Sequence, residues 1–155
     1  MNKVIIRLFE DAVINDKFSF SPSIDKLKQS VIRDFCAFSK DSLGISEMPE
    51  VRLVDKKEEN MSTGAYTPSA NSLVVLAGKR ALLDVLRSIG HELTHRKQDE
   101  DGILENIPQQ GNRGKDDMTD VGVDFEDEAN AKGGALVKQF SRQYGKVPYE
   151  KLFDL

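Results

Sequence analysis

Two histidines four residues apart, with a glutamate directly after the first, constrain this chain more than any other feature. His91 and His95 are its only histidines, and Glu92 follows His91. Leucine and isoleucine recur at helical spacing in the same stretch and predict a helix from 78 to about 98: Leu82, Leu86, Ile89 and Leu93. A spacing of four places both imidazoles on one helix face, a turn apart. That face lies about 180–220° from the apolar stripe, so we expect it to border a cleft or solvent.

This face has the chemistry of a metal site. Neutral imidazole is a good zinc ligand, and zinc lowers the pKa of its water to about 7. Glu92 points about 100° round the helix from His91. There a carboxylate can take a proton from that water and return it to a leaving group. The alternative is a solvent-exposed polar face, shared with Asp84 and Ser88, on which two histidines are four apart by chance. The glutamate and the strand–turn–helix order favour the metal site.

A catalytic zinc site needs a third protein ligand, and a carboxylate has to supply it because the chain has no third histidine. The single cysteine, Cys36, lies in an apolar helical stretch and is predicted to be buried. Acidic residues open the third predicted helix, which runs from 125 to about 144. Glu126 is the best placed of them, with Asp124 and Glu128 as alternatives. Acidic residues at a helix N-terminus are also favoured by the macrodipole alone.

Glu126 shares its helix face with an amide and a glycine. Asn130 lies about one turn further on and Gly133 about two turns further on. The missing side chain at Gly133 would let this helix cross closely over the histidine helix, and Asn130 could hydrogen-bond a ligand histidine. The two helices are therefore expected to bring His91, His95 and Glu126 to one ion.

Three stretches of the chain resemble the gluzincin metallopeptidases, and in particular their compact minigluzincin and ImmA/IrrE-like branches. These stretches are HELTH at 91–95, EDEAN at 126–130 and YTPSANSLVV at 66–75. The resemblance implies a zincin-like fold with one Zn²⁺ per chain, bound by His91, His95 and Glu126. It also implies that Glu92 acts as general base and acid.

The resemblance further implies where substrate binds. The strand at 72–77 corresponds to an edge strand that pairs with an extended protein or peptide substrate in these enzymes. Asn130 stands where the family has an aspartate beside the ligands. Many gluzincins stabilise the oxyanion with a tyrosine or histidine, and the candidates for that role in this chain are Tyr144, Tyr149 and Arg113.

The remaining pattern predicts one α+β domain over 1–155, with helices packed on a small mixed sheet. Ser21-Pro22 predicts the start of a first helix that ends near Gly44. A polar stretch at 99–123 predicts a long loop. Strands are predicted at 4–9, 51–55 and 73–77.

Composition limits the classes to which this chain can belong. Charged residues make up 31%, and no apolar run approaches the length of a membrane span, so we expect a globular domain without a membrane partner. The net charge of −4 argues against nucleic acid as a partner. The N-terminal stretch lacks the apolar core of a signal peptide, and a single cysteine cannot form an intrachain disulfide, which favours a reducing cytoplasm. Nothing in the pattern indicates an oligomeric state.

Three functions remain open at this level. The leading hypothesis is a zinc metalloendopeptidase that hydrolyses peptide bonds in proteins, because the residue types and spacings suit metal-assisted hydrolysis. The second is a catalytically weak or inactive binding or regulatory module of zincin fold, in which zinc only holds the helices together. The third is hydrolysis of another bond in a compact substrate, which would leave the edge strand unused.

Overall fold

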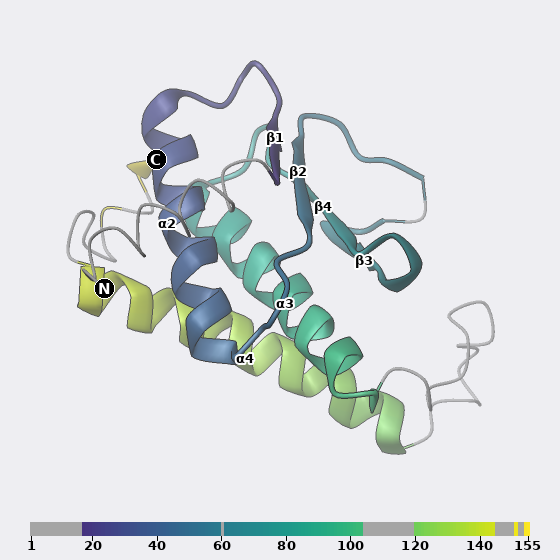
Figure 1. Ribbon diagram of the computed structural model, residues 1–155. Coiled ribbons are helices and arrows are strands. Elements are labelled where there is room, and N and C mark those ends of the chain that lie inside the picture. Colours follow the sequence, from purple (N-terminus) through teal and green to yellow (C-terminus); the bar gives the residue numbers. More distant parts are fainter. Residues whose placement is uncertain (1–16, 60, 104–119, 145–150, 152–153) are drawn as a thin grey trace, which may run out of the picture.

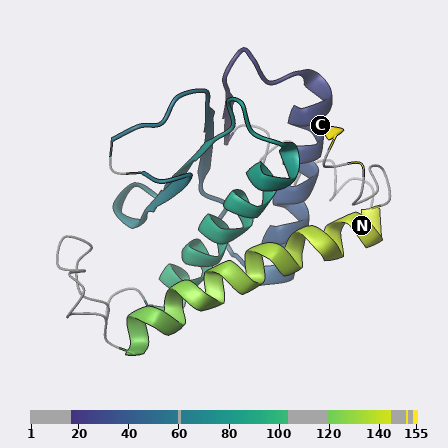
Figure 2. The same ribbon diagram turned by 180° about the vertical axis from the view of Figure 1, so that it is seen from behind.

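The structure, a computed structural model, describes residues 17–59, 61–103, 120–144, 151 and 154–155. In these residues, three α-helices lie on one side of a four-stranded mixed sheet (Figures 1 and 2). The helices are α2 (Lys26–Leu43), α3 (Leu82–Glu100) and α4 (Asp120–Tyr144). The strands are β1 (Phe18–Phe20), β2 (Glu50–Val54), β3 (Gly64–Thr67) and β4 (Ser72–Leu76), with a 3₁₀ turn, η1 (Pro68–Ala70), between the last two. The predicted α+β class is confirmed.

The strand predicted to form the edge lies inside the sheet. The strand order is β1-β2-β4-β3, so β4 pairs with β2 in parallel and with β3 antiparallel. The prediction that the strand at 72–77 is the edge was therefore wrong, and β3 has that place among the described strands. No strand was predicted at 64–67, because four residues before Pro68 are too few to show an alternating pattern.

The sheet is covered by helices on one face. Val51 and Leu53 of β2 and Leu73 and Val75 of β4 point into the core and are buried. Arg52 lies between the two β2 residues and is exposed, because successive side chains of a strand point to opposite faces. This alternation fixes the register of β2 against the helices.

Helix α2 begins later than its sequence predicted. Asp25 is the N-cap, and its carboxylate accepts the Lys28 backbone N–H. Ser21, the predicted cap, instead donates its backbone N–H to the Leu53 carbonyl, 3.0 Å away, and so continues the β1–β2 pairing. The end of the helix is as predicted, because Gly44 adopts the left-handed conformation with φ of 73°.

Helix α3 is the centre of the fold. It contacts β3 and β4 on one side and α2 and α4 on the others. Its predicted apolar stripe is confirmed, because all four side chains are at most 2% exposed: Leu82, Leu86, Ile89 and Leu93. Cys36 of α2 is also in the core, as predicted, and burial raises the pKa of its thiol.

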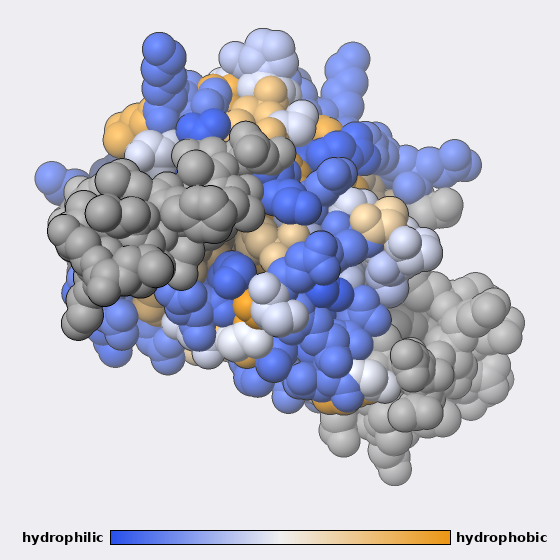
Figure 3. Space-filling model, in the orientation of Figure 1, coloured by the Kyte–Doolittle hydropathy of each residue, from blue (hydrophilic) through white to orange (hydrophobic). Residues whose placement is uncertain are grey.

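Polar side chains cover most of the described surface on the face shown in Figure 3. Large exposed apolar side chains are confined to Leu27 and Ile103 within the described ranges. In the same ranges, no helix combines the length and the apolar character needed to cross a bilayer.

Some predictions fall outside the described residues. These are the strand at 4–9, most of the loop at 99–123, and the oxyanion candidates Arg113 and Tyr149. The predicted loop was too long at both ends, because α3 continues to Glu100 and α4 begins at Asp120. Asp124 and Tyr144 belong to α4, but their side chains lie outside the described part of the structure.

Candidate metal centre

The two predicted histidines and the predicted glutamate meet at one point. The nearest ligand atoms of His91, His95 and Glu126 all lie within 4.8 Å of one another. The two imidazole Nε2 atoms are 3.0 Å apart, and each lies 3.3 Å from a Glu126 carboxylate oxygen. Ligand atoms that surround a tetrahedral zinc at about 2.0–2.1 Å are themselves about 3.3 Å apart. The donor set and its spacing therefore fit one zinc ion.

A close crossing of α3 and α4 brings Glu126 to the histidines. A Cβ added to Gly90 would lie 3.0 Å from the Gly133 Cα, and one added to Gly133 would lie 3.0 Å from the His91 backbone nitrogen. Only glycine at both positions allows backbones to approach this closely. The predicted role of Gly133 is confirmed.

Gly133→Ala is expected to destabilise the protein by about 1–3 kcal/mol, because its methyl group would also lie 3.0 Å from the Arg87 carbonyl and push the helices apart. Gly134→Ala is the matched control. No described atom of a neighbouring element lies within 4 Å of its added Cβ, so alanine there should stabilise the helix by about 0.5–1 kcal/mol. Urea unfolding of both variants measures the difference. Two equally stable variants would contradict the close crossing.

The charges of the triad favour a cation. Hydrogen bonds from His91 and His95 hold the pKa of Glu126 far below its usual range. Burial alone would lower the pKa of His91, but its hydrogen bond to Glu126 and the nearby Glu92 carboxylate raise it overall. Without metal, these groups attract a proton between them. A divalent cation can take the place of that proton at the same point.

His95 is more enclosed than the sequence suggested. It is 7% exposed, and its ring stacks on Phe125 with centroids 4.3 Å apart. The predicted cleft exists, because a groove of about 1240 Å³ reaches both histidines. Phe125 of α4 covers His95, whereas Asp84 on the same face of α3 is exposed.

A glutamine that sequence reasoning missed holds His95 in place. Gln98 is buried, and its Oε1 lies 2.8 Å from the His95 Nδ1. Its Nε2 donates to the Phe125 carbonyl and to Glu128. The amide oxygen thus faces the imidazole, so Nδ1 carries a proton and Nε2 is free for a metal. The position three residues after His95, on the same helix face, was the available signal.

Asn130 of α4 lies beside the other histidine of the triad. The Asn130 side chain hydrogen-bonds His91 and contributes to its raised pKa. Glu128, an alternative third ligand, points to Gln98 and lies 3.9 Å from the Lys132 ammonium. Glu126 is therefore the carboxylate that joins the histidines among the described side chains.

Glu92 lies between the triad and the edge strand β3. It is 7% exposed, and burial raises the pKa of its carboxyl against the opposing effect of His95 and then His91. The Tyr66 backbone N–H of β3 donates to this carboxylate. A Cβ added to Gly64 of β3 would lie 3.3 Å from the Glu92 Oε1, so only a small residue leaves room there. A glutamate whose pKa is raised is suited to accept and return a proton.

The groove is lined by the triad, by β3 and by residues 58–59 and 61–63. Its lining includes Glu92 and all four residues of β3, together with Arg87 and Asn130 on the helix side. No family model, curated protein or solved structure matches this chain. The function is therefore inferred from the site itself.

Proposed function

We propose that this chain is a gluzincin-type zinc metalloendopeptidase that hydrolyses peptide bonds in protein substrates. One Zn²⁺ per chain would be held by His91, His95 and Glu126. The observation that carries the proposal is the convergence of this triad beside a buried Glu92 in a groove that follows a strand edge. When bound, zinc would polarise the scissile carbonyl and lower the pKa of water.

The chain's own residues supply the proton transfers. Glu92 is the base for the attacking water and then the acid for the leaving amine. Its carboxylate is aimed by the Tyr66 N–H on one side and is close to the histidines on the other. Gln98 and Asn130 hold the imidazoles, so the ligand geometry is set before substrate arrives.

A peptide is the substrate that best suits the edge strand β3. The Thr63 carbonyl accepts the Leu76 N–H, 2.9 Å away, as part of the antiparallel β3–β4 pairing. Backbone groups alternate between the two edges of such a strand, so those of Gly64 and Tyr66 point to the groove side. The Tyr66 N–H already bonds the Glu92 carboxylate, which leaves the Gly64 groups and the Tyr66 carbonyl for a peptide. An extended peptide can pair with that edge as an added strand. The proposal therefore pairs the substrate with β3 instead of the strand at 72–77.

The deciding experiment is digestion of an unstructured protein, such as reduced and denatured casein, by the zinc-loaded protein. We expect new peptides in the mass spectrum, their loss with a chelator, and their return when zinc is restored. A protein that binds one zinc, loses stability without it and yields no cut products would instead be the non-catalytic module with a structural zinc.

A cytoplasmic location is part of the proposal. The only cysteine, Cys36, is a buried free thiol in the core. A buried thiol of this kind suits a reducing compartment.

A further inference from the structure

A group of charged side chains at the end of α3 connects this helix to the edge strand. Arg96 is at its centre, with a side chain only 11% exposed. Its Nη1 donates to the Tyr66 hydroxyl and to Asp99, each 3.3 Å away. Its Nη2 lies 2.9 Å from the Glu100 carboxylate, and its Nε donates to the Glu47 carbonyl. All three guanidinium nitrogens therefore have protein partners.

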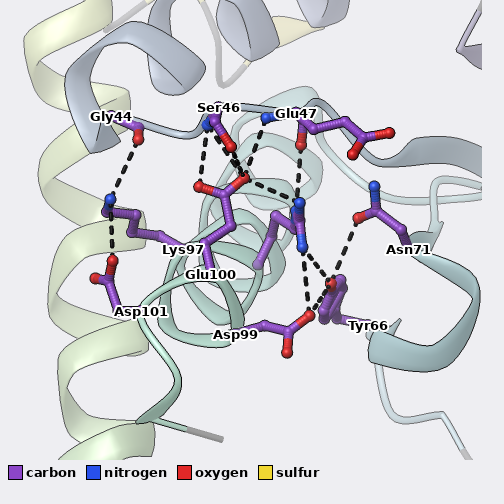
Figure 4. A network of polar contacts seen from close by, with 10 residues as sticks. Gly44, Ser46, Glu47, Tyr66, Asn71, Lys97, Asp99, Glu100 and Asp101 are labelled. Carbon is purple, nitrogen blue, oxygen red and sulfur yellow. Dashed lines mark hydrogen bonds and ion pairs between the residues drawn. The ribbon is translucent and has the colours of Figure 1, made fainter.

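Figure 4 shows the two ends of this group. Glu100 points to the turn after α2, where it accepts the backbone N–H groups of Ser46 and Glu47. Asp99 points to Tyr66 and accepts its hydroxyl proton over 2.7 Å. One end thus holds the turn after α2, and the other holds β3.

Tyr66 connects this group to the candidate base. Its side chain bonds Asp99 and Arg96, while its backbone N–H bonds the Glu92 carboxylate. The residue is 8% exposed, so the hydroxyl bonds are shielded from competing water. Burial and the Asp99 carboxylate raise the pKa of Tyr66 to about 12, and the phenol stays protonated as a donor.

The edge strand needs such an anchor. β3 has four residues and pairs with β4 alone among the described strands. A short edge strand with one ladder opens more readily than an inner strand. Any displacement of β3 would move the Tyr66 N–H away from Glu92 and would shift the backbone groups that face the groove.

We propose that Arg96 and Asp99 are positioning residues that act through Tyr66 to fix the edge strand and the direction of the Glu92 carboxylate. The catalytic consequence rests on the proposed peptidase function. The anchoring itself does not, because it is a property of the folded chain with or without substrate.

The test combines hydrogen exchange with kinetics on zinc-loaded full-length protein. Tyr66→Phe removes the donor of the hydrogen bond between the Tyr66 hydroxyl and Asp99, and Asp99→Ala removes its acceptor. Amide exchange in 64–67 should rise about tenfold or more, with little change in 73–76, because a hydrogen bond to a charged group is lost from β3 only. Zinc content should stay at one per chain, and kcat on a casein peptide should fall about tenfold.

Two further variants make the test specific. Asp99→Asn keeps an acceptor for the Tyr66 hydroxyl and should retain most of the protection in 64–67. Lys97→Gln is the matched control, because Lys97 bonds the Gly44 carbonyl and Asp101, neither of which belongs to β3. Its exchange and kcat should equal those of the wild type.

The outcomes separate this inference from the proposed function. The anchoring would be overturned if both Tyr66→Phe and Asp99→Ala showed the wild-type rate of amide exchange in 64–67. Faster exchange spread equally over the sheet and α3 would also overturn it, because the group would then act only on global stability. Local loss of protection in a protein that cuts no peptide would support the anchoring and contradict the peptidase.

Discussion

Glu92→Gln is expected to abolish peptide cleavage while the protein still binds one zinc. Glutamine has the size of glutamate, and its amide oxygen can still accept the Tyr66 N–H, so the fold should be kept. It cannot take a proton from water at neutral pH. General acid–base catalysis contributes about 10²–10⁴-fold, and kcat should fall by that factor. The measurement is the initial rate of peptide cleavage at saturating substrate, together with zinc content.

Glu59→Gln is the matched control for this prediction. Glu59 is an exposed carboxylate that lines the same groove and does not belong to the triad. The change removes the same charge from the groove wall, so it separates proton transfer from the loss of negative charge. Cleavage at the wild-type rate by Glu92→Gln would overturn the assigned role of Glu92.

Glu126→Ala and His95→Ala are expected to remove the metal. Each change deletes one of three ligands. Loss of a residue that only hydrogen-bonds a ligand lowers metal affinity ~10–100-fold, and loss of the ligand itself should lower zinc affinity further. Protein purified without added zinc should then contain almost none, as measured by mass spectrometry of the metal. The wild type should also gain thermal stability on zinc addition, and these variants should not.

Glu128→Ala is the control that tests the choice of third ligand. Glu128 lies on the same turn of α4 and bonds Gln98, but it is not part of the triad. Its loss should leave one zinc per chain. Zinc retained in Glu126→Ala and lost in Glu128→Ala would show that the third ligand is assigned to the wrong carboxylate.

The parts of the site that follow helical spacing were predictable from the sequence. His91 and His95 share a face because they are four residues apart, and the apolar stripe on α3 determined which side enters the core. Glu126, Asn130 and Gly133 share a face of α4 for the same reason. Helical geometry is local, so the residues themselves contain this information.

Gln98, which hydrogen-bonds His95, was not predicted, for a different reason. Gln98 could be placed near His95 by spacing, but its role depends on the Phe125 carbonyl of another helix, 27 residues further along the chain. That carbonyl holds the Gln98 amide nitrogen and thereby turns the amide oxygen to the imidazole. A contact between two helices cannot be derived from the pattern of either one.

The sheet shows the same difference between local pattern and tertiary contact. Short β-prone apolar runs predicted strands at 51–55 and 73–77, which are β2 and β4. Only the tertiary structure decided that β4 lies inside the sheet and β3 at its edge, because pairing joins segments that are distant in sequence. The helix faces on which His91, His95 and Glu126 lie were therefore predictable from local spacing. The strand edge beside Glu92, and the Arg96–Asp99–Tyr66 contacts that hold it, exist only once the sheet has assembled against α3.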